Sequence, residues 1–335
     1  MAKRFFRVEK ADRPDLAAIG STSQLDVQGY AFPKIFPLLP VTEKSGTMTV
    51  APAGLTESKG TKGRQNGAAL NGTTIAMVDV NWAAARFEGR GKLYEDDGAA
   101  YATAEAADQA GAELAQRLAW NKVEDEAFAK VFTANRTNAA VTLTDHHVVK
   151  LLQKQAKALR KYGKPTLVMT TNTWLDFVEI PEIRVRLEKL AGAGNDIGFI
   201  MTDFEKVRAA VSTFLSFDSI VLFDSDIVGT SHDGEIAVIG LRPEAKSGNV
   251  SALAKSKALY GWTPIYIPED APADKPFDMR AWYDDDNKCN VYDAEAFLGV
   301  VEAFSGAVVM TKLAAEYTEY PTVIVNAAAE AGGEG

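Results

Sequence analysis

The chain has 335 residues, of which 47% are hydrophobic and 24% charged, and its formal net charge is −9 at pH 7. This composition predicts a folded protein with one elaborate domain or two to three lobes. The acidic balance argues against a protein that grips nucleic acid through a basic face, although not against one that encloses it. The single cysteine, Cys289, excludes an intrachain disulfide and fits a reducing compartment. Because no apolar run approaches the ~18 residues of a membrane helix, we expect no membrane partner.

The first 41 residues read as an N-terminal arm. Residues 1–29 are polar and mixed in charge, which predicts an extended segment. Residues 30–41 contain three prolines, which favour an extended backbone and argue against a helix. Phe32 and Phe36 within this segment must still be buried against something. It is either a strap across its own core or a clamp on a neighbouring subunit, and the sequence leaves both readings open.

Residues 42–82 form the most informative stretch, because they cannot bury themselves. Met48 and Val50 alternate with threonines, and Met77 belongs to a second alternating run. Alternation with a period of two predicts strands, so we interpret the stretch as an extended hairpin, or flap. A two-stranded hairpin alone is marginal in water, so a flap of this length needs a surface to lie on.

The tip of the flap, residues 53–72, is rich in small and polar side chains. Its basic residues are Lys59, Lys62 and Arg64, with Glu57 as the one acid. In a monomer this composition favours a solvated loop. Long loops without secondary structure tend to be functional or disordered, however, and a basic tip on an acidic protein suits docking on the acidic surface of another copy.

A long helix, the spine, is predicted at residues 103–134. Thr103 suits the N-cap position, and no proline interrupts the following residues. Acidic side chains near its start suit the positive end of the helix dipole. The apolar stripe expected to face a sheet consists of Leu114, Leu118, Trp120, Val123, Phe128, Val131 and Phe132.

Beyond residue 135, predicted helices and strands alternate without a regular βαβ repeat, which gives an α+β class with a mixed sheet. One helix is expected to follow Thr144 as its cap, and a hairpin is expected at residues 277–292. The other expected helices lie at 174–178, 181–190 and 203–215, and the other expected strands at 166–169, 219–223, 235–241, 260–267 and 307–310. The last residues, 327–335, are disordered by composition.

No motif for enzyme chemistry fits its context. The glycine loop at 192–198 follows a helix rather than a strand, so it does not match a dinucleotide-binding turn. Adjacent Ser231-His232-Asp233 read as a surface turn, since a catalytic triad needs side chains from separate places. The acidic run 284–287 lacks the glycine and distal glutamate of a calcium loop. We therefore expect no enzyme, no cofactor and no metal.

The order of elements resembles the major capsid proteins of tailed bacteriophages, whose Hong Kong phage-type fold is shared with encapsulins. The resemblance covers residues 29–310 and rests on the arm, the flap, the spine helix and the mixed lobe that follows. The stretch 164–174 is similar to the family's strand-then-helix passage into its axial lobe, and the hairpin 277–292 is similar to its long β-ribbon.

The resemblance implies a division of the chain into the regions of that fold. These are an N-terminal arm at 1–41, an extended flap (E-loop) at 42–82, a peripheral domain at 83–143 and 274–295, an axial domain at 144–273 and 296–325, and a flexible tail at 326–335. It also implies intersubunit contacts through the arm and flap. The residues expected to make them are Phe32, Phe36, Met48, Val50, Lys59, Lys62, Arg64 and Met77.

The implied function is that of a structural virion protein. Copies of the chain would assemble into pentamers and hexamers of an icosahedral shell around double-stranded phage DNA, enclosed without specific binding. Assembly would take place in the host bacterial cytoplasm, with a separate scaffolding protein, a portal protein and room for a decoration protein. Two alternatives stay open: an encapsulin-like compartment with protein cargo, and a hydrolase of unrecognised type that uses Asp284, Asp285 or His232.

Overall fold

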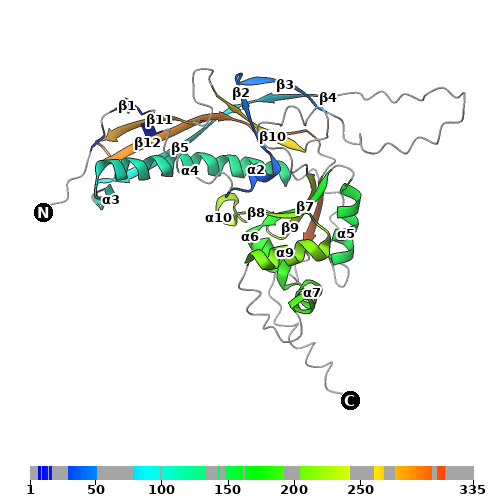
Figure 1. The fold of residues 1–335 in the computed structure, drawn as a ribbon. Helices are drawn as coiled ribbons and strands as arrows, with labels where there is room; N and C mark the ends of the chain where they lie inside the picture. The colour runs from blue at the N-terminus through cyan, green and yellow to red at the C-terminus, as the bar shows by residue number, and fades with distance from the viewer. Residues whose placement is uncertain are drawn as a thin grey trace, which may run out of the picture. The chain divides into compact units, whose positions relative to one another are not determined.

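A computed structural model gives the fold of the chain (Figure 1). It describes residues 7–8, 10–13, 15–16, 29–50, 78–98, 100–132, 142–143, 148–160, 163–191, 204–241, 260–267, 276–303 and 308–313. The chain divides into two compact units: unit 1 comprises residues 1–130 and 242–304, and unit 2 comprises residues 131–241 and 305–335. Helices and sheets occur in both, so the expected α+β class is confirmed.

Unit 1 is built on a seven-stranded sheet. Its main path runs β1 (Ala11–Asp12), β11 (Asp278–Asp284), β12 (Cys289–Leu298), β10 (Gly261–Tyr266) and β13 (Val301–Glu302), while β2 (Leu38–Val41) pairs with β10 and β5 (Ala85–Tyr94) pairs with β12. The hairpin expected at 277–292 is β11–β12, whose second strand runs further than expected. β10 pairs antiparallel with both β12 and β13, so both strands belong to this sheet.

One long helix, α4 (Ala104–Val131), runs along the strands β11, β12 and β5 (Figure 1). As predicted, Thr103 caps it: the Ala106 N–H donates to Thr103 Oγ1 at 3.2 Å. The apolar stripe is only partly as expected, since Leu114 and Leu118 are 40% and 37% exposed. Small residues occupy much of the buried face instead, namely Ala107, Ala112, Ala115, Ala119 and Ala127.

Glycines set how closely α4 approaches the sheet. A Cβ on Gly89 of β5 would lie 1.9 Å from the Ala115 carbonyl oxygen, and one on Gly91 would lie 2.6 Å from the Gly111 carbonyl oxygen. A Cβ on Gly111 itself would meet the Tyr292 ring at 2.2 Å. The backbones of helix and strand are therefore in direct contact, and no larger residue fits between them.

The described part of the arm lies along its own unit. β1 pairs with β11, and the Arg13 N–H donates to the Met279 carbonyl at 2.8 Å. The Arg13 guanidinium contacts Asp15 at 2.7 Å and Asp108 at 3.1 Å. These contacts hold the arm on the sheet edge of its own subunit.

Unit 2 contains a five-stranded sheet in the order β6 (Thr142–Leu143), β14 (Val308–Leu313), β9 (Glu235–Leu241), β7 (Lys164–Thr170) and β8 (Ser219–Phe223). Its helices are α5 (Val148–Leu159), α6 (Thr171–Glu179), α7 (Pro181–Ala191), α9 (Phe204–Leu215) and α10 (Ser225–Val228). The strands β8 and β9 have the bounds that the sequence predicts. Thr144, the expected cap of the first helix, lies outside the described residues.

The core of unit 2 follows from two sequence patterns. β7 is buried at six consecutive positions, as expected of an apolar strand covered on both faces. The helix α5 buries Val148, Leu152, Ala156 and Leu159 at helical spacing and turns its lysines to the surface. None of the helices in the described ranges is long and apolar enough to cross a membrane.

Candidate functional sites

The proline-rich segment is a strap across the core of unit 1. Phe32 and Phe36 are fully buried, with ring centroids 5.7 Å from Trp120 and 5.2 Å from Tyr260, respectively. The following residues, β2, run parallel to β10 and extend its sheet. Of the two readings that the sequence leaves open, the structure supports the strap: both aromatic side chains, which the resemblance placed among the intersubunit contacts, are buried within their own chain.

A short helix, α2 (Phe32–Ile35), begins the strap, although its prolines argued against any helix. The proline is tolerated because it stands in the first turn, where a backbone N–H has no partner within the helix. A carboxylate from α4 satisfies the free donors: Glu124 accepts from the N–H groups of Ala31 at 2.9 Å and Phe32 at 2.8 Å. Beside it, Tyr30 donates to Asn121, and burial raises the pKa of Tyr30 to about 12.

Replacing Glu124 tests whether this carboxylate holds the strap in place. Glu124→Ala leaves two buried backbone donors without their acceptor, so we expect the free energy of unfolding to fall by about 2–4 kcal/mol. Glu124→Gln keeps one acceptor oxygen and is expected to lose less. Urea unfolding followed by tryptophan fluorescence measures both. Asp125→Ala, at the exposed neighbouring position, is the control, and an equal loss there would contradict the role of Glu124.

The base of the flap is anchored on the same unit. β3 (Ser45–Val50) pairs antiparallel with β4 (Val78–Ala83), which confirms the expected strand character of the described part of the flap. Met48 and Val50 are buried in a cluster with Trp262 and Val301. Like the strap aromatics, these two side chains were expected to contact a neighbour, and the structure instead places them in the core of their own chain.

Hydrogen bonds fix the junction between β7 and α6 in unit 2. Thr170 caps α6 by accepting from the Thr173 N–H at 3.1 Å. Asp233 accepts from the Thr170 hydroxyl at 2.7 Å and from the Asn172 amide at 3.0 Å. On the far side of the junction, the Ser225 hydroxyl accepts from the Asn172 N–H at 3.0 Å. The start of α6 is therefore held in place by hydrogen bonds from both sides of the junction.

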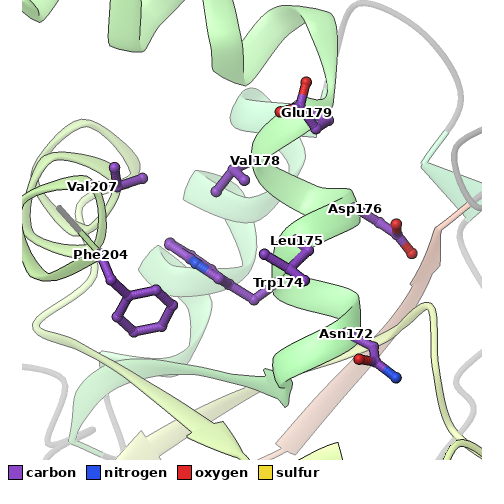
Figure 2. Close-up of a pocket in the computed structure, with 8 residues that line it drawn as sticks. All are labelled: Asn172, Trp174, Leu175, Asp176, Val178, Glu179, Phe204 and Val207. Atoms are coloured by element: carbon purple, nitrogen blue, oxygen red, sulfur yellow. The ribbon is translucent and has the colours of Figure 1, made fainter. Parts of the chain in front are cut away.

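A hollow of about 490 Å³ lies against α6 and the start of α9. Its lining residues are Asn172, Trp174, Leu175, Asp176, Val178, Glu179, Phe204 and Val207. Figure 2 shows Trp174 and Val178 pointing from α6 toward α9, whereas Asp176 and Asn172 lie on the other side of the helix. Leu175 is 61% exposed and Phe204 is 43% exposed. The hollow thus offers exposed apolar surface beside a carboxylate.

The electrostatic environment of Asp176 is unfavourable for its charge. Partial burial raises the pKa of Asp176, and the nearby charge of Asp233 raises it further. No basic side chain in the described part of the chain forms an ion pair with Asp176. Glu179, the other acid of the hollow, contacts Arg184 at 3.1 Å.

Comparison with solved structures identifies the fold. A phage-related protein from Bordetella bronchiseptica RB50 matches with a TM-score of 0.56 at 12% sequence identity, over 94% of this chain and 100% of that chain. The chain has the tailed-phage major capsid fold. The virus-like particle protein from Pyrococcus furiosus matches at a TM-score of 0.48 and 7% identity, over 89% and 98% of the two chains. The capsid of cyanophage P-SCSP1u matches at 0.45 and 11%, over 85% and 88%.

By sequence, no protein-family model and no curated protein matches the chain. The resemblance was inferred from the order and spacing of the predicted elements, and it is confirmed at the level of the fold. At these identities the similarity establishes architecture, and the role of individual residues has to come from their contacts.

Within this capsid fold, the residues considered for catalysis have structural partners. His232 Nδ1 lies 2.8 Å from Glu235 Oε2, and Asp233 is bound at the start of α6 as described above. Asp284 accepts from the backbone N–H groups of Asp286 and Asn287, which closes the β11–β12 turn. Burial raises the pKa of the Cys289 thiol, which disfavours the reactive thiolate. The described residues contain no group of three or more side chains suited to hold a metal ion.

The remaining predicted site residues, Lys59, Lys62, Arg64 and Met77, lie outside the described residues. Sequence reasoning missed the hollow on α6, because Leu175 and Phe204 come from different helices and look like ordinary core residues in the sequence. It also missed β5. The signal for that strand was the alternation of Phe87, Gly89, Gly91 and Leu93, all of which face α4.

Proposed function

We propose that the chain is the major capsid subunit of a tailed bacteriophage. Copies would assemble into pentamers and hexamers of an icosahedral shell that encloses double-stranded DNA. The supporting observation is the fold match to a phage-related protein, which extends over nearly all of this chain and the whole of that one. A structural role rather than catalysis agrees with the partners found for the candidate catalytic residues.

The acidic charge of the chain suits this role. A net charge of −9 repels phosphate, so a shell of such subunits would enclose DNA without adsorbing it. The proposed location is the virion, with assembly in the bacterial cytoplasm. The proposed partners are a scaffolding protein and a portal protein, with room for a decoration protein.

In this proposal the two units correspond broadly to the peripheral and axial domains, and the flap extends over an adjacent subunit. Because Met48 and Val50 are anchored in unit 1, the proposed intersubunit contact moves outward to Lys59, Lys62, Arg64 and Met77. Phe32 and Phe36 would then act indirectly, by fixing the strap from which the flap departs.

Expression of the full chain tests the proposal. We expect capsomers or closed particles in negative-stain micrographs, either from the chain alone or together with the proposed scaffolding protein. An absence of both under every assembly condition would contradict a shell function. Particles that package DNA through a terminase support the capsid, whereas particles that co-purify with a specific protein cargo support the encapsulin-like alternative.

A further inference from the structure

The exposed face of α5 carries a row of lysines. Lys150, Lys154 and Lys157 follow the spacing that puts side chains on one face of a helix, and all three are exposed. Arg160 continues the row and donates to the Ser216 carbonyl at 3.5 Å. Among the described residues no acid pairs with any of the three lysines, so the row repels itself in the isolated subunit.

The α6 hollow has the complementary properties. It exposes Leu175 and Phe204, and Asp176 at its edge has no cationic partner among the described residues. An apolar floor beside a carboxylate suits a lysine side chain, whose alkyl stem lies on apolar surface while its ammonium group contacts the acid. The hollow and the row are therefore complementary in both charge and polarity.

The two surfaces belong to the same unit but stand apart. In Figure 1, α5 and α6 lie at different sides of unit 2, so the contact is assigned to two subunits. We propose that the lysine row on α5 of one subunit docks in the α6 hollow of a second copy. This inference rests on the proposed shell function and assigns one of its contacts to named residues.

Such a contact uses two different patches, and a contact of this kind repeats from copy to copy. If the rotation between subunits closes, the result is a ring, as pentamers and hexamers require. A row of lysines also attracts DNA, which is a polyanion, but DNA binding would not explain the exposed apolar floor of the hollow. A copy of the chain accounts for both surfaces at once.

A charge exchange tests the contact. We expect Asp176→Lys and Lys154→Glu each to lower the fraction of chain that sediments as capsomers or particles by about tenfold, because like charges then face each other. The double variant restores opposite charges and is expected to recover most of the assembly. Lys189→Glu, an equal charge change at an exposed position on α7, is the control and should assemble like the wild type.

Disulfide trapping provides a second measurement, which leaves Asp176 and Glu179 unchanged. Cys289 is the single native cysteine and is buried, so the background is low. Oxidation of the Leu175→Cys, Lys154→Cys double variant should give a ladder of covalent oligomers, and either single variant should give none. A dimer from Leu175→Cys alone would overturn the two-patch arrangement.

The outcomes separate this proposal from the shell function. If both charge variants assemble into particles like those of the wild type, and the cysteine pair gives no ladder, the contact is overturned and the shell function stands. A wild-type chain that never forms capsomers or particles would overturn both. If a charge variant fails to fold, as judged by circular dichroism, the cysteine pair decides the question. Particles of the double cysteine variant that assemble like the wild type but give no ladder would overturn the contact.

Discussion

Gly89→Ala is expected to lower the free energy of unfolding by about 3 kcal/mol or more, near the upper end of the usual range for overpacking. The new Cβ would lie 1.9 Å from the Ala115 carbonyl oxygen and 2.6 Å from the Ala119 nitrogen. Both are backbone atoms of α4, so no side-chain rotation relieves the clash. The helix has to move away from the sheet, which opens the packing along its alanine face.

Urea unfolding of Gly89→Ala and the wild type measures the effect. Arg90→Ala is the matched control, because the Arg90 side chain points to the opposite face of β5. That side chain is 57% exposed and contacts Asp293 at 2.7 Å. An exposed ion pair of this kind contributes at most about 1 kcal/mol. If the stability of Gly89→Ala fell no further than that of Arg90→Ala, the helix would have more room than the structure shows.

Deletion of residues 53–72 is expected to leave the subunit folded but to abolish or misdirect shell assembly. The base of the flap should survive the deletion, since Met48 and Val50 are held by Trp262 and Val301. The residues left between Val50 and Val78 are enough to connect the two strands. Loss of the tip then removes a contact with the neighbouring subunit and little of the core.

Circular dichroism and thermal unfolding check the fold of the deletion variant, and negative-stain microscopy checks its assembly. A triple variant, Lys59→Ser, Lys62→Ser, Arg64→Ser, keeps the length of the tip and removes its charge. We expect it to assemble less efficiently than the wild type if the tip docks on an acidic surface. Normal particles from the deletion variant would show that the flap is a loop without an assembly role.

Much of unit 2 was predictable because its strands are short apolar runs and its helices have clear apolar faces. The runs at 219–223 and 235–241 are strands with those bounds. The spine helix was also predictable, because nothing between Thr103 and Val131 interrupts a helix. In these cases local pattern and tertiary packing favour the same structure.

Other features depend on contacts that the sequence does not display. β5 uses glycines at two positions where a strand normally has large residues, because α4 lies against its backbone. The same close approach exposes Leu114 and Leu118, since the helix turns its alanines toward the sheet. The strap could be placed only once Glu124 and Trp120 were known to face it.

The division of unit 1 into residues 1–130 and 242–304 has a consequence for synthesis on the ribosome. β2 pairs with β10, so its partner emerges more than 220 positions later, as the register Leu38↔Thr263 shows. The spine helix and β5 likewise wait for β12. Contacts so distant in sequence slow folding. Most of unit 2 lies between the two segments of unit 1 in the sequence, so it is synthesised before unit 1 is complete, apart from its strand β14. The nascent chain therefore exposes the apolar faces of the first segment of unit 1 until residues 242–304 are made.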